Sequence, residues 1–203
     1  MSAAERAFDV VKEQDSPVRY TRRPSRIVAA LLAGTVAIVL NIFALKAADL
    51  VPLATARGGL LRLITPWLSG PLEQSGISRL WAMVGGPTPS APVFQIGFHT
   101  FVGLLMAMFY ALLLEPLLPK SAWVKGLLYA AGVWILNAAV ILPATGEGFA
   151  GRDHLTIAGI IWFAAAHTLF FMVLASSYAE LRRSPLSIID VRRQFGRSPK
   201  QRK

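Results

Sequence analysis

Two histidines and two tyrosines occur at matching positions in apolar stretches of the chain, and their types suit them to chemistry. Tyr110 follows His99 after eleven residues, and Tyr178 follows His167 at the same spacing. Eleven residues of α-helix return to within about 20° of the same face, so each pair forms a stripe about 16 Å long. Histidine can relay protons or ligate a metal, and a tyrosine hydroxyl can extend a hydrogen-bonded path.

Two asparagines, Asn41 and Asn137, lie in other apolar stretches and supply amide groups. Polar side chains are costly inside a membrane, so we expect all six to face the interior of a helix bundle. One interpretation is packing by interhelical hydrogen bonds, which contribute about 0.6 kcal/mol each. The other is a functional polar site. The predicted site comprises Asn41, His99, Tyr110, Asn137, His167 and Tyr178.

The two histidines also allow an alternative in which His99 and His167 ligate haem b. Bis-histidine ligation needs two imidazoles on facing helices and an apolar slot for the porphyrin. Aromatic residues available for a slot are Phe101, Trp162, Phe170 and Phe171. However, bulky Phe98 flanks His99, and no basic residue is placed near the middle of the membrane for the propionates. We therefore expect no resident cofactor and keep haem b as the alternative.

Other motifs for chemistry are weak in this sequence. Glu147, Asp153 and His154 could bind a metal, but their spacing matches no ligand pattern, and a solvated loop is the simpler interpretation. The chain has no cysteine, which excludes thiol catalysis, disulfides and cysteine-based metal sites. It also lacks Gly-x-Ser-x-Gly, phosphate-loop and His-Glu-x-x-His motifs. A non-enzymatic protein is expected, with lipid-directed catalysis as a weaker alternative.

Composition predicts that these residues are positioned by membrane-spanning helices. Of 203 residues, 54% are hydrophobic and 16% charged, whereas soluble domains have about 45–50% and 25%. About 20 apolar residues cross a bilayer core of about 30 Å. Four stretches are long enough, at about 27–48, 93–114, 123–142 and 155–178. The first exceeds a signal peptide's apolar region, so we expect a four-helix domain over 27–178 between tails 1–26 and 179–203.

The 50–92 segment is too long for a simple turn between the first two spans. It contains short apolar runs around Trp67 and Trp81, each too short to cross a bilayer. Tryptophan is enriched at membrane–water interfaces. The segment is therefore predicted to form short interfacial helices.

Charge predicts the orientation of the chain. The formal net charge is +10, and sixteen of the twenty-one Lys and Arg lie in the two tails and the 115–125 turn. Lys and Arg are enriched on the cytoplasmic side, so both termini are predicted to be cytoplasmic in a bacterial inner membrane. The basic tails would attract anionic lipid. No nucleic-acid partner is expected, because residues 192–203 contain a single aromatic, Phe195, and no recognisable binding motif.

An internal repeat indicates how the spans are arranged. Residues 99–111 align without gaps on 167–179 with five identities in thirteen, and residues 31–41 align on 127–137 through Leu-Leu and Leu-Asn pairs. Chance agreement between Leu/Ala-rich helices is the alternative. A true duplication predicts two helical hairpins in parallel orientation, related by a pseudo-twofold axis along the membrane normal. Ala30-x-x-x-Gly34 and Gly126-x-x-x-Ala130 are predicted sites of close helix packing.

Residues 99–146 resemble the YagU-like family of bacterial inner-membrane proteins. The resembling residues are His99, Tyr110, Glu115, Pro119, Lys120, Trp123, Gly126, Leu127, Leu128, Pro143 and Gly146. This is about a quarter of the chain, and the 50–92 segment departs from the family in sequence. The resemblance implies an inner-membrane protein with a tie to acid tolerance and names no catalytic residues. We expect a role in envelope or acid-stress physiology as a scaffold, a narrow polar conduit, or a subunit with a membrane partner or second copy.

Overall fold

The computed structural model describes residues 23–51, 53–54 and 59–183 as an arrangement of helices. Four helices in this part of the chain are long and apolar enough to span a membrane, which confirms the predicted all-α membrane fold. They are Arg26–Ala47, Pro92–Leu117, Ala122–Ala144 and Ile157–Arg183. Each helix begins and ends within three residues of the expected apolar stretch, except that the last helix continues five residues beyond Tyr178. The remainder of both predicted tails lies outside the described residues.

Each of the two middle spans contains a π-helical segment followed by a short α-helical end. The second span comprises α5 (Pro92–Phe109), η1 (Tyr110–Leu114) and α6 (Glu115–Leu117). The third comprises α7 (Ala122–Leu136), η2 (Asn137–Ile141) and α8 (Leu142–Ala144). Pro116 and Pro143 each follow the π segment by two residues. A proline ring clashes with the carbonyl four residues earlier, which lies within the π segment in both spans, and the wider turn relieves this clash.

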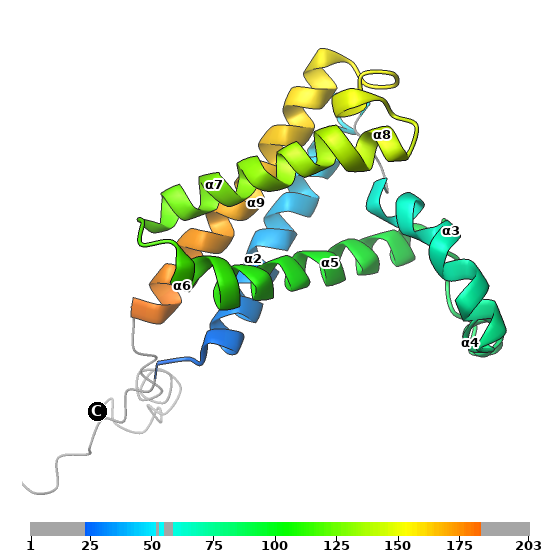
Figure 1. Cartoon of the computed structure of the whole chain (residues 1–203), viewed down its shortest axis with the longest axis horizontal. Helices are drawn as coiled ribbons and strands as arrows, with labels where there is room; N and C mark the ends of the chain where they lie inside the picture. The colour runs from blue at the N-terminus through cyan, green and yellow to red at the C-terminus, as the bar shows by residue number, and fades with distance from the viewer. Residues whose placement is uncertain (1–22, 52, 55–58, 184–203) are drawn as a thin grey trace, which may run out of the picture.

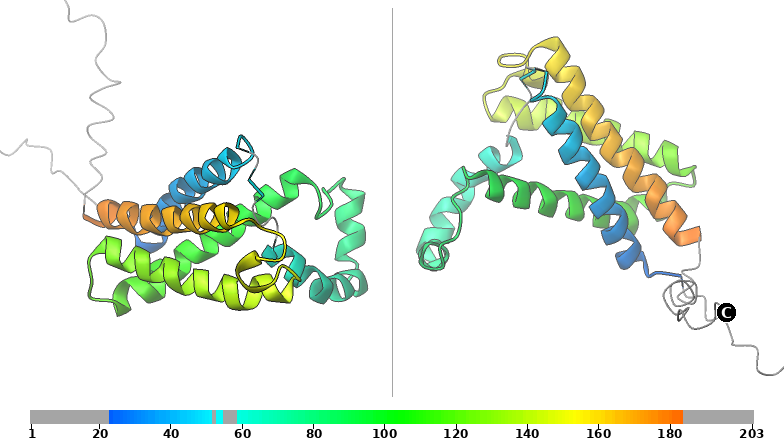
Figure 2. Two further views of the ribbon diagram at one scale, coloured as in Figure 1. Left: turned by 90° about the horizontal axis from the view of Figure 1, so that it is seen from above. Right: turned by 180° about the vertical axis from the view of Figure 1, so that it is seen from behind.

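The helix α2 (Arg26–Ala47) and the helix α9 (Ile157–Arg183) pack against each other along the centre of the molecule. The helix α7 packs on the other side of α9, and α5 packs on α2. Figures 1 and 2 show that α5 and α7 are close where α6 joins them and diverge toward the opposite end. We call the end with Pro24, Glu115 and Arg182 the terminal end, and the opposite end, which carries the helix α3 (Gly59–Gln74), the α3 end. The divergence leaves a wedge between α5 and α7 that opens toward the α3 end.

Small residues allow the central helices to approach closely, as the two small-residue motifs predicted. Four alanines of α2 are fully buried: Ala29, Ala30, Ala33 and Ala37. A Cβ atom on Gly34 would lie 2.7 Å from the Cβ of Ala107, and one on Gly126 would lie 2.8 Å from the carbonyl oxygen of Phe171. Helices in lipid associate through van der Waals contact, which such close backbone approach increases.

The terminal end is joined by polar contacts between helix ends. The ammonium group of Lys125 donates to the carbonyl oxygen of Glu115 at 2.8 Å and lies 3.5 Å from its carboxylate. Arg182 donates to the carbonyl oxygen of Pro24 at 2.7 Å. Because each contact joins a different pair of spans, the terminal end is fixed while the wedge opens at the other end.

An arm of two helices projects from the α3 end (Figure 1). It consists of α3 (Gly59–Gln74) and α4 (Ile77–Met83), both within the segment predicted to hold short interfacial helices. Trp67 is 79% exposed and Met83 is 82% exposed. Arg62 of α3 forms an ion pair with Glu147 and donates to the carbonyl oxygen of Thr145 at 3.3 Å. These contacts hold the start of the arm against the α8–α9 connection, whereas Trp67 and Met83 farther along the arm remain exposed.

Candidate functional site

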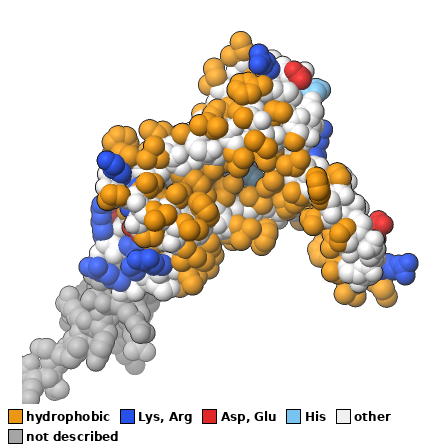
Figure 3. Space-filling model, in the orientation of Figure 1, with side chains coloured by type: hydrophobic (Ala, Val, Ile, Leu, Met, Phe, Trp, Pro, Cys, Tyr) orange, Lys and Arg blue, Asp and Glu red, His pale blue; other side chains and the backbone are white. Residues whose placement is uncertain are grey.

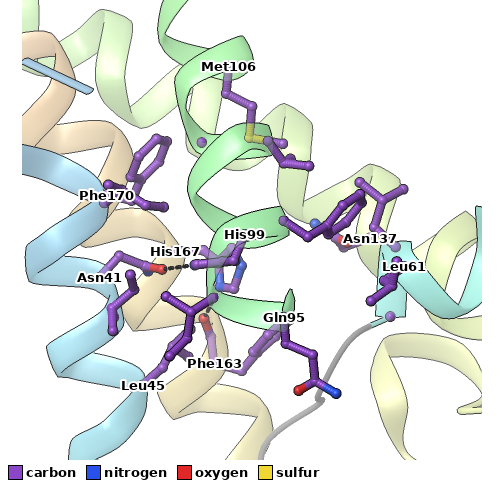
Figure 4. Close-up of a pocket in the computed structure, with 18 of the residues that line it drawn as sticks. Asn41, Leu45, Leu61, Gln95, His99, Met106, Asn137, Phe163, His167 and Phe170 are labelled. Atoms are coloured by element: carbon purple, nitrogen blue, oxygen red, sulfur yellow. Dashed lines mark hydrogen bonds between the residues drawn. The ribbon is translucent and has the colours of Figure 1, made fainter. Parts of the chain in front are cut away.

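A pocket of about 350 Å³ lies in the wedge between α5 and the third span, against the central helices α2 and α9. Its lining comes from five regions of the chain: α2, the first turn of α3, α5, the η2–α8 segment and α9. Figure 4 shows His99 and His167 together within it, and Figure 3 shows a hollow on the face between α5 and α7. Four of the six predicted site residues line it: Asn41, His99, Asn137 and His167. The structure therefore brings His99 and His167 to one pocket.

Asn41 joins three of the four spans through hydrogen bonds. Its Nδ2 donates to the carbonyl oxygen of Ala166 on α9 at 2.8 Å, and its Oδ1 lies 2.8 Å from Nε2 of His99 on α5. Only 1% of Asn41 is exposed. The residue thus fixes the orientation of His99 while satisfying its own buried amide.

His167 is oriented by its own helix. Its Nδ1 donates to the carbonyl oxygen of Phe163, one turn earlier, at 2.8 Å. The rings of Phe163 and His167 also lie 4.2 Å apart between centroids. These two contacts direct the remaining ring nitrogen of His167 away from the α9 backbone.

The pocket has a polar opening and an apolar floor. Lys46, Asp49 and Gln95 line it at the α3 end, where Lys46 and Asp49 form an ion pair at 3.4 Å. Met106 lies two helical turns beyond His99 toward the terminal end, and Phe170 and Phe171 lie about one turn beyond His167. The floor therefore separates the histidines from the terminal end.

The two predicted tyrosines lie outside this pocket lining, in an aromatic cluster nearer the terminal end. Tyr110 is 1% exposed, and its ring meets that of Tyr178 edge to face at 5.6 Å. Tyr129 stacks on Tyr110 and also contacts Phe171 at 4.3 Å. Each His–Tyr stripe is therefore divided into a pocket half and an aromatic half. Sequence reasoning did not find Tyr129, which has no counterpart in the repeat.

Asn137 shares the pocket without joining helices. Its Nδ2 donates to the carbonyl oxygen of Val133, one turn earlier on its own span, at 3.1 Å. Asn41, the residue it aligns with in the repeat, instead bonds two other helices. The duplication itself stays a prediction. The matched histidines share a pocket, as a repeat would place them. However, a strict twofold axis would exchange α2 with α7 and α5 with α9, so α5 and α7 should pack together as α2 and α9 do, whereas they diverge.

The predicted outer-loop residues form an ion-pair network with the arm. Glu147 contacts Arg62 through one carboxylate oxygen and Nδ1 of His154 through the other, at 3.2 Å for the histidine. Asp153 takes part through its backbone N–H, which donates to the carbonyl oxygen of Glu147 at 3.1 Å. Within the described ranges, no three His, Cys, Asp or Glu residues are grouped to hold a metal ion. Arg62 was missed by sequence reasoning because it lies 85 residues from Glu147.

The haem alternative stays a prediction. In the present arrangement, Nε2 of His99 is engaged by Asn41, so it would have to leave this partner before ligating iron. Two of the four residues expected to form a porphyrin slot, Phe170 and Phe171, line the pocket. Phe101 is instead 59% exposed, and Trp162 donates to the carbonyl oxygen of Ala44 at 2.9 Å.

Comparison of the chain with models of protein families, with curated proteins and with solved structures gives no match.

Proposed function

We propose that the chain is a non-enzymatic inner-membrane protein that binds a small lipid-soluble molecule in the pocket beside His99 and His167. The observation that carries this proposal is the pocket itself, which has polar groups within a mainly apolar lining. Ligand sites in proteins occupy about 300–1,000 Å³ and place a few polar groups among hydrophobic side chains. A volume of about 350 Å³ suits a small ligand.

The position of the pocket supports access from the bilayer. The hollow in Figure 3 lies between two helices that are long and apolar enough to span a membrane. Leu105 and Ile135, on these two helices, are exposed, as expected of side chains that face lipid. A molecule dissolved in the hydrocarbon layer could reach the histidines through this wedge.

A binding pocket explains the geometry better than a continuous polar conduit. The polar lining ends at Met106, Phe170 and Phe171, and neither Tyr110 nor Tyr178 lines the pocket. The resemblance to the YagU-like family supports a role in envelope or acid-stress physiology. In that role the protein would hold its ligand for a membrane partner or for a second copy of the chain.

Cysteine labelling tests this proposal without background, because the chain contains no cysteine. Val102 lines the pocket, whereas Leu105 lies one turn further along α5 and is exposed. In proteoliposomes, Val102→Cys should react with N-ethylmaleimide faster than Leu105→Cys, because thiols react as thiolates and need water to ionise. Para-hexylphenol should slow labelling of the first variant alone.

Two outcomes would contradict a ligand pocket. Equal labelling rates at both positions, unaffected by para-hexylphenol, would show that Val102 does not face a hydrated, ligand-accessible cavity. Labelling of Val102→Cys by a membrane-impermeant thiosulfonate from both sides of the membrane would instead support the narrow polar conduit.

A further inference from the structure

The hydrogen bonds around Asn41 determine which nitrogen of His99 carries a proton. The carbonyl oxygen of Ala166 can only accept, so the amide nitrogen of Asn41 must face it, at 2.8 Å. The amide oxygen of Asn41 therefore faces His99, and Nε2 of His99 must donate to it. In a neutral ring the other nitrogen, Nδ1, is then an acceptor.

His167 has the opposite tautomer, which also leaves one ring nitrogen as an acceptor. Its Nδ1 must donate, because its partner is the carbonyl oxygen of Phe163. In the neutral ring Nε2 is left as an acceptor. Charged side chains are costly within membrane-spanning segments, which favours the neutral form of both rings. The two histidines thus retain one acceptor nitrogen each and no free donor.

These two acceptors are open to a ligand. Neither Nδ1 of His99 nor Nε2 of His167 has a hydrogen-bond partner among the described residues. Neither nitrogen is fully buried. Among the described residues, the hydroxyl oxygen of Tyr178 is the one fully buried side-chain polar atom that has no hydrogen-bond partner, so the two unpaired nitrogens must both have some exposed surface. Both rings line the pocket, so their two acceptor nitrogens are available to a ligand bound there.

From this arrangement we infer that the pocket selects lipid-soluble molecules that present an uncharged hydroxyl donor to His99 and His167. This inference rests on the proposed function and specifies its ligand class. The hydroxyl would donate to one of the two acceptor nitrogens. The apolar body would contact Phe163, Phe170 and Phe171, which line the same part of the pocket. A molecule with only acceptor groups would leave both nitrogens unpaired.

A matched pair of ligands tests the need for a donor. Para-hexylphenol and para-hexylanisole differ in a single group, because the hydroxyl of the first is a methyl ether in the second. Their dissociation constants are measured by protection of Val102→Cys from maleimide in proteoliposomes. The phenol should bind about tenfold more tightly, equivalent to about 1.4 kcal/mol, since one buried hydrogen bond separates the two.

Substitution of His167 then assigns the acceptor. His167→Leu, in the Val102→Cys background, should reduce the phenol's advantage severalfold, because it removes one acceptor without breaking a bond between helices. Leu105→Ala, at an exposed position of α5, is the control and should retain the full difference. Thermal unfolding of both variants verifies that they are folded.

The results separate this inference from the proposed function. Equal protection by phenol and ether, or stronger protection by the ether, overturns the donor requirement and leaves the pocket. A preference that His167→Leu leaves unchanged overturns the participation of His167 and leaves Nδ1 of His99 as the acceptor. Failure of both compounds to protect the cysteine overturns the pocket and the donor inference together.

Discussion

At the scale of single residues, Asn41 fixes the position of one of the two pocket histidines. Its two hydrogen bonds reach α5 and α9, so one side chain fixes the position of His99 relative to two other helices. His167 needs no such partner, because its own helix supplies one. The pocket therefore depends on an interhelical amide at one histidine and on local backbone at the other.

Replacement of Asn41 by leucine should destabilise the protein by about 1 kcal/mol, since two interhelical hydrogen bonds of average strength are lost. Thr35→Val is the matched control on α2, because Thr35 donates to the carbonyl of Leu31 within the same helix, at 2.8 Å. The free energy of unfolding is measured in bicelles by titration with sodium dodecyl sulfate. Equal losses for the two variants would contradict a bridging role for Asn41.

The sequence predicts the polar residues of the site more readily than their partners. Asn41, His99 and His167 stand out because polar side chains are costly among apolar residues. The bond from Asn41 to Ala166 joins residues 125 positions apart and ends on a backbone carbonyl, which no residue type reveals. Tyr110 and Tyr178 satisfy the same criterion as the histidines but pack in a separate aromatic cluster. Helical spacing gives a shared face, and packing decides what each part of that face meets.

At the scale of helices, the membrane spans can be predicted from the sequence, because hydropathy depends on composition alone. The packing of the spans against one another cannot be predicted in the same way. In lipid every face of a helix is apolar, so hydrophobic periodicity does not identify the packed face. Small-residue motifs do identify it at Gly34 and Gly126. The divergence of α5 from α7, which creates the pocket, has no equivalent signal. The π segments follow from Pro116 and Pro143 only once the helix is known to continue through each proline.

The contact of α7 with α9 at Gly126 gives a prediction at this scale. An alanine Cβ there would lie 2.8 Å from the carbonyl oxygen of Phe171 and 3.2 Å from the Cβ of Ala175, so the helices must separate. Gly126→Ala should lower the free energy of unfolding by about 1–3 kcal/mol, as overpacking does. Gly132→Ala is the control, because nothing lies within 4 Å of its Cβ position. A similar, small effect of both substitutions would show that α7 and α9 are not in close contact.

At the scale of the whole molecule, charge divides the protein into two ends. Six basic residues of the described chain lie at the terminal end, namely Arg23, Arg26, Lys120, Lys125, Arg182 and Arg183. At the α3 end, basic and acidic residues are equal in number in the described ranges: Lys46, Arg62, Arg79 and Arg152 with Asp49, Glu73, Glu147 and Asp153. The segments outside the described ranges strengthen the difference, because they include ten more of the sixteen basic residues predicted on the cytoplasmic side.

This division predicts the orientation of the protein, since Lys and Arg near span ends are retained on the cytoplasmic side. Fusions after Lys120 and after Ser187, which lies outside the described residues, should be cytoplasmic. A fusion after Ser75, between α3 and α4, should be periplasmic. Each position is fused separately to green fluorescent protein, which fluoresces in the cytoplasm, and to alkaline phosphatase, which is active in the periplasm. Immunoblots control for fusion levels. One span separates Ser75 from Lys120, so a cytoplasmic result at both positions would contradict the four-span topology. Results reversed at all three positions would contradict only the predicted orientation.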